Sequence, residues 1–134
     1  MSRITGIEIN KYFKKLLQED EVISTIVEKK NIQPLVLAPT SFPFISFTHD
    51  EIVTNYVKAG DAYDECYEIV ACVSNDYEQS IAIVSRVREI FEYKMYQDEN
   101  IYISDFTVVS ISEGVEKDTY IQNIVFKFEV HSKK

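Results

Sequence analysis

The residues of this chain that could carry out acid–base or metal chemistry are few and lie far apart. The two histidines are His49 and His131, and the first of them opens the run His49-Asp50-Glu51. Side chains alternate between the two faces of a strand, so Asp50 would point away from both neighbours and the three could not converge on one metal ion. His131 stands beside the end of the sequence. We therefore expect structural or solvent-exposed roles for both histidines and no metal site.

An acidic cluster and two thiols are the remaining chemical candidates. Asp61, Asp64 and Glu65 fall in a predicted turn and could bind a cation weakly, although a solvated loop is the favoured interpretation. Cys66 and Cys72 are six residues apart in a strand-like segment. At about 3.3 Å per residue they would lie roughly 20 Å apart, beyond the reach of a disulfide. They are predicted to be free, buried or half-buried thiols in a reducing compartment.

Motifs that are typical of enzymes are missing from the sequence. It contains no G-x-S-x-G, no glycine-rich phosphate loop and no paired C-x-x-C. The three glycines, Gly6, Gly60 and Gly114, all fall where turns are expected. The sequence therefore predicts no catalytic residues, no bound cofactor or metal, and no enzymatic activity.

The composition indicates one acidic domain. The chain has 134 residues, of which 46% are hydrophobic, and a formal charge of −8. One domain with a single core fits this length. A general nucleic-acid-binding protein would need a basic surface to displace counterions, so the charge argues against that class. No apolar run approaches the ~18 residues of a membrane span, and we expect a soluble, intracellular protein without membrane partners.

Two segments of helical periodicity and several of strand periodicity would carry these residues. Helices are predicted over 7–20, with Ile9, Phe13 and Leu17 on one face, and over 74–93. Strands are predicted over 44–58, 66–74, 100–112 and 119–131, with a stiff proline loop before the first and the run EGVEKD as a hairpin link between the last two. The expected fold class is α+β, an antiparallel sheet of about four strands with two main helices packed on one face.

The length of the predicted strands points to an interaction surface. Strands at the edges of a sheet invite pairing with another subunit, and a long hairpin tip can serve as an arm toward a partner. The residues singled out for a subunit interface are Thr54, Tyr56, Glu113, Val115 and Lys117. The alternative is a protein whose edges are merely shielded by charge.

Three stretches together resemble a known family. IQPLVLAPTSFPFISF leads through prolines into a strand, and YEIVACVSNDYEQSIAIVSRVREIF is a strand followed by a helix. A closing β-hairpin completes the pattern. This arrangement resembles the tail-completion proteins of long-tailed phages, which include tail terminators and tail-to-head joining proteins. The resemblance spans nearly the whole chain and implies a single tail-completion-like domain over 1–134.

The resemblance implies a structural protein of a phage or prophage virion. Such proteins cap the tail tube as a ring, commonly a hexamer, and join it to the head. The implied partners are other copies of the chain, the tail tube protein and the head–tail connector protein. No sequence-specific nucleic-acid binding is implied, and the acidic charge fits a ring through which DNA slides. The implied location is the virion tail, and the host cytoplasm during assembly.

The sequence leaves two other classes of function open. A small acidic adaptor or binding module would capture a basic protein partner and would be a compact monomer or dimer. An enzyme with an unrecognised site would need a polar cluster in a pocket, which the sequence does not supply.

Overall fold

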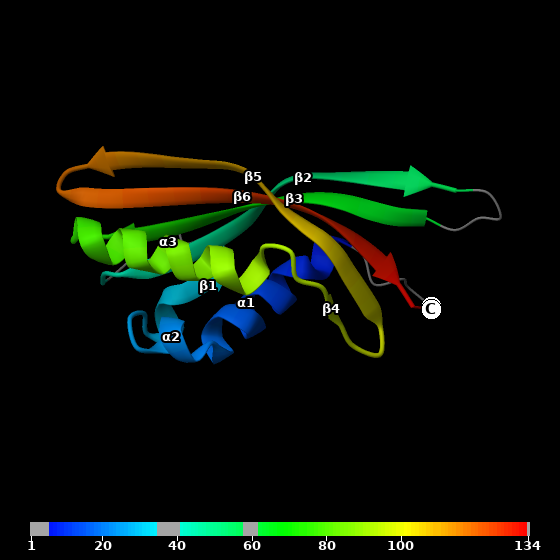
Figure 1. Cartoon of the computed structure of the whole chain (residues 1–134), viewed down its shortest axis with the longest axis horizontal. Helices are drawn as coiled ribbons and strands as arrows, with labels where there is room; N and C mark the ends of the chain where they lie inside the picture. The colour runs from blue at the N-terminus through cyan, green and yellow to red at the C-terminus, as the bar shows by residue number, and fades with distance from the viewer. Residues whose placement is uncertain (1–5, 35–40, 58–61, 134) are drawn as a thin grey trace.

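The computed structural model describes residues 6–34, 41–57 and 62–133. They form a curled sheet with all of the described helices on one of its faces (Figure 1). The strands are β1 (Ile32–Pro34), β2 (Phe44–Tyr56), β3 (Ala62–Ser74), β4 (Tyr96–Gln97), β5 (Ile101–Glu116) and β6 (Thr119–Ser132). The helices are α1 (Ile9–Glu19), α2 (Glu21–Ser24) and α3 (Tyr77–Phe91), with the 3-10 turns η1 (Gly6–Glu8) and η2 (Lys29–Asn31).

The predicted sheet of about four antiparallel strands with two main helices is wrong. The strand order is β1-β2-β3-β6-β5-β4, and the sheet is mixed because β1 runs parallel to β2. One helix dominates, since α3 has 15 residues and the others are shorter. The two unpredicted strands have only three and two residues, so they leave no periodic pattern in the sequence.

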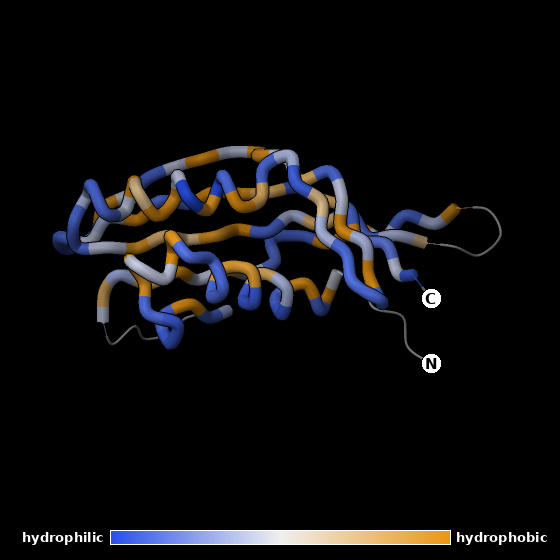
Figure 2. The backbone as a smooth tube through the Cα atoms, turned by 60° about the horizontal axis from the view of Figure 1, so that its bottom comes forward, coloured by the Kyte–Doolittle hydropathy of each residue, from blue (hydrophilic) through white to orange (hydrophobic). Residues whose placement is uncertain are grey.

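The core lies between the helices and the sheet and is rich in phenylalanine. Phe13 of α1 packs at its centre, with its ring 4.5 Å from that of Phe91 on α3 and 5.7 Å from that of Phe128 on β6. Phe47 and Phe106 complete the cluster from β2 and β5. Hydrophobic residues recur along the helices, as the orange stretches of the tube in Figure 2 show. Burial of these rings joins the helical layer to strands from both hairpins.

The hairpin of β5 and β6 turns more tightly than the sequence indicated. Its link is Lys117-Asp118, and both residues have positive φ, 47° and 64°, as in a two-residue type I′ turn. The predicted hairpin is present, but the predicted link EGVEKD is too long, and Gly114 lies within β5 opposite Ile121 of β6. Beyond Val108, every residue of β5 is exposed to solvent.

The short strands cover only parts of their neighbours. β1 pairs with residues 45–47 of β2, and β4 pairs with residues 102–103 of β5. No other described strand lies along the outer side of 48–56 or of 104–116. In Figure 1 the C-terminal end of β2 points right and that of β5 points left. No helix within the described ranges is long and apolar enough to cross a membrane.

Candidate functional site

His49 joins the start of the described chain to a buried carboxyl group. Its Nδ1 lies 2.8 Å from Oε1 of Glu68, and its Nε2 lies 3.2 Å from the carbonyl oxygen of Ile7. A carbonyl oxygen only accepts, so Nε2 carries the hydrogen of that bond. The Nδ1 contact then needs one proton, held by the imidazole or by Glu68. Burial raises the pKa of Glu68 to about 7, although the hydrogen bond from His49 opposes the rise.

The predicted acidic loop cluster does not form within the described residues. Asp64 and Glu65 lie in β3 and point to opposite faces of the sheet, while Asp61 lies outside the described residues. Asp64 is buried and accepts hydrogen bonds from the backbone N–H of Gly6 at 2.8 Å and from Oγ1 of Thr54 at 2.7 Å. Across the described part of the chain, no three His, Cys, Asp or Glu side chains are grouped to hold a metal ion.

The two cysteines are free and buried, as predicted. Both lie on the helix-facing side of β3. Burial raises the pKa of the Cys66 thiol to about 12, and it also raises that of Cys72. Because the thiolate is the reactive form, neither side chain is suited to act as a nucleophile.

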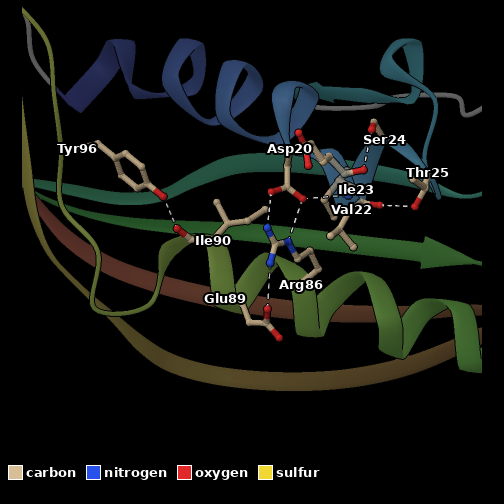
Figure 3. Close-up of polar contacts among 10 residues, drawn as sticks. Asp20, Val22, Ile23, Ser24, Thr25, Arg86, Glu89, Ile90 and Tyr96 are labelled. Atoms are coloured by element: carbon tan, nitrogen blue, oxygen red, sulfur yellow. Dashed lines mark hydrogen bonds and ion pairs between the residues drawn. The ribbon is translucent and has the colours of Figure 1, made fainter.

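A polar groove of about 700 Å³ lies between the end of α1 and α3, and Arg86 and Arg88, which line it, are paired with carboxylates. Figure 3 shows the contacts of Arg86. Arg86 donates to both carboxylate oxygens of Asp20, at 2.7 and 3.0 Å, and to Glu89 at 3.0 Å. The hydrogen bond from Arg86 holds the pKa of Asp20 below its usual value. Asp20 also caps α2 by accepting from the backbone N–H of Ile23. The ion pair of Asp20 with Arg86 therefore joins the junction of α1 and α2 to α3.

The residues singled out for a subunit interface lie on two different edges of the sheet. Tyr56 ends β2 and is 83% exposed, whereas Thr54 is partly buried and tied to Asp64. Val115 of β5 is 67% exposed, and Lys117 occupies the hairpin turn. The structure thus does not bring the two groups together within one chain.

Glu113 and its surroundings were only partly anticipated. The carboxylate of Glu113 folds toward α3, where it accepts from Tyr77 Oη at 3.1 Å and from Gln122 Nε2 at 2.9 Å. Sequence reasoning missed Ile111, which lies on the same face of β5 and is 45% exposed. The alternation of Ile111 and Val115 with polar residues was a usable signal for a strand with one apolar face.

The comparisons with known proteins identify a shared fold. No family model and no curated protein matches the chain. Among solved structures, the fold is similar to that of a chain in the "Virion of native gene transfer agent (GTA) particle", with a TM-score of 0.73 and 15% sequence identity. The match covers 87% of this chain and 90% of the other. The two chains therefore share one architecture over nearly the whole length of each.

Proposed function

We propose that this chain is a structural virion protein of a phage or prophage, which caps the tail tube as a ring and joins it to the head connector. The observation that carries the proposal is the fold shared with a virion chain over 87% of this one. The match covers most of this chain and most of the other chain, as expected when the two chains have the same overall fold. The sequence resemblance to tail-completion proteins supports the same role.

The candidate site supports a role in binding other protein chains. The side chains best suited to chemistry, His49, Glu68, Asp64, Cys66 and Cys72, are hydrogen-bonded within the fold or buried, which is why we propose no enzymatic activity and no cofactor. Within the described residues, the chain presents two strand edges that no described strand covers, and exposed apolar side chains, among them Tyr56 and Val115. We propose copies of the chain, the tail tube protein and the head–tail connector as partners, within one domain spanning 1–134 and located in the virion tail.

Deletion of the gene in the strain that carries it tests this role. Particles are induced from the deletion strain, from the parent and from a complemented strain, and are counted by negative-stain microscopy. We expect separate heads and tails without the gene, and joined particles when it is restored. Joined particles of normal number in the deletion strain would refute the proposal. In that case, isolation of a basic protein with the tagged chain would favour the acidic adaptor instead.

A further inference from the structure

We propose that the open edge of β2 in one copy of this chain pairs with the open edge of β5 in the next, so that the sheet continues from subunit to subunit. The pairing is head-to-tail, since each copy offers two different edges. This inference deepens the proposed ring and rests on it for its biological setting, but its physical basis lies in the strands alone.

The open segment of β2, residues 51–56, is a regular strand that pairs with a described strand on one side only. A bulge interrupts the β2–β3 ladder between His49 and Glu51. After it, residues 51–56 pair with β3 in unbroken register, and β1 does not reach them. Bulges commonly protect an edge from unwanted pairing, and this segment lies beyond the bulge. No described strand pairs with its outer N–H and C=O groups.

The open segment of β5 has the same construction at the opposite edge of the sheet. Two bulges interrupt its ladder with β6, between Ser104 and Thr107 and between Val108 and Ser110. Residues 110–116 then pair with β6 without interruption as far as the Lys117-Asp118 turn, and β4 does not reach them. The two regular open segments, 51–56 and 110–116, are therefore similar in length.

The side chains of the two segments match when the helices of both copies lie on the same face. The register places Ile111 opposite Ile124 and Ile52 opposite Cys66, and both of these partners are buried on the helix-facing side. Alternation then puts Val115 and Tyr56 on that same side, where both are exposed. Pairing the edges would bring these apolar side chains together, with Thr54 and Glu113 at the middle of each row. Aliphatic–aromatic pairs across strands are stabilising.

Strand directions also permit this arrangement. Each step from β2 to β3, β6 and β5 is antiparallel, so β2 and β5 run in opposite directions within one copy. A neighbouring copy in the same orientation therefore sets its β5 antiparallel to β2. Through the ladders Thr54 is level with Ile103 and Glu113 is level with Ile45, so the two open segments lie at opposite ends of the sheet. They meet when neighbouring copies are offset along the strands by about the length of Asp64–Cys72 in β3. A symmetric pairing of two β5 edges would close a dimer and leave both β2 edges open. Head-to-tail pairing instead satisfies both edges of every copy, and the curl of the sheet favours closure over an endless ribbon.

Two edge variants and their mixture test the inference. One is Ile111→Glu with Val115→Glu on β5, and the other is Val53→Glu with Tyr56→Glu on β2; all four side chains are exposed. Each variant spoils one edge and keeps the other. A control, Ala82→Glu with Ser85→Glu, adds two carboxylates on the exposed side of α3. Circular dichroism checks that all three fold, and sedimentation measures mass from micromolar to millimolar concentration.

Head-to-tail pairing predicts an unusual result for the mixture. Wild type and control should form species larger than dimers, and each edge variant alone should associate about tenfold or more weakly. An equimolar mixture of the edge variants should form a heterodimer and nothing larger, because one intact edge of each kind remains. If the β2-edge variant alone formed a dimer, or if the wild type stayed monomeric, the inference would be wrong. Normal particles without the gene, together with a heterodimer in the mixture, would overturn only the proposed function.

Discussion

Replacing Glu68 by glutamine should stabilise the protein at neutral and higher pH. The carboxyl group is fully buried, and its Oε2 has no hydrogen-bond partner among the described residues. Above its pKa the native protein must therefore hold a carboxylate in a poorly solvating environment. A glutamine amide can still donate to Nδ1 of neutral His49 but carries no charge. The substitution should remove the cost of ionisation and keep the contact.

The size of the effect follows from the raised pKa. Below about pH 4.5 the carboxyl group is protonated in the folded and unfolded states alike, so it adds no pH dependence there. From pH 4.5 to about pH 7 the unfolded chain loses the proton first, and the native state loses stability as pH rises. At about 1.4 kcal/mol per pKa unit, the rise from 4.5 to about 7 corresponds to about 3 kcal/mol. Glu68→Gln should regain up to that amount above pH 7.

Chemical denaturation at a series of pH values measures this effect. The free energy of unfolding of Glu68→Gln should match that of the wild type at about pH 4 and exceed it at about pH 8. Glu65→Gln is the matched control, because Glu65 lies in the same strand on the opposite face and pairs with Lys127. This control should not gain stability at high pH. Parallel pH profiles for wild type and Glu68→Gln would refute the assignment of Glu68 as a buried, proton-holding group.

Three further predictions concern packing, turn geometry and thiol reactivity. Gly6→Ala should lower the free energy of unfolding by about 1–3 kcal/mol, because the new Cβ would overlap Sγ of Cys66. Cys66→Ala should reduce this loss in a double-mutant cycle, whereas additive effects of the two substitutions would argue against the overlap. Replacing Lys117-Asp118 by Asn-Gly should raise the free energy of unfolding by about 0.5–1 kcal/mol and the denaturation midpoint with it, since both positions have positive φ. An unchanged midpoint would show that the turn carries no strain. Cys66 and Cys72 should resist an aromatic disulfide reagent until denaturant is added, and rapid reaction of the native protein would contradict their burial.

The parts of the fold that could be predicted are those with a long, unambiguous periodicity. The helix predicted over 7–20 corresponds to α1, because apolar residues recur on one face through three turns. The strand predicted to start near Phe44 does so, since Pro43 ends the preceding irregular segment. The helix predicted over 74–93 begins later, at Tyr77, because Asp76 caps it by accepting from the backbone N–H of Gln79.

The features that could not be predicted depend on contacts between distant residues. The β5–β6 turn uses Lys and Asp where sequence rules favour glycine, and the available Gly114 lies within the strand. Glu68 shares the core face of β3 with Cys66 and Cys72, but its partner His49 lies on another strand. Likewise, nothing near Asp20 in sequence indicates Arg86, 66 residues further along the chain. Segment 51–56 was predicted as strand, whereas residues 113–116 of the other segment fell in the predicted hairpin link. The open sides of both became visible only from the extents of β1 and β4.

The uneven burial of the β5–β6 hairpin has a consequence for how the protein opens. Near Phe106 and Phe128 the hairpin is anchored by stacked rings, 4.6 Å apart, in the core. Toward the Lys117-Asp118 turn, β5 is exposed throughout. Separating the strands there breaks ladder hydrogen bonds but uncovers little new apolar surface, so the free energy of local opening should decrease from the core to the tip. Amide hydrogen exchange should follow that gradient, and the outer hairpin is the part that can adapt its twist to a neighbour while the aromatic core stays closed.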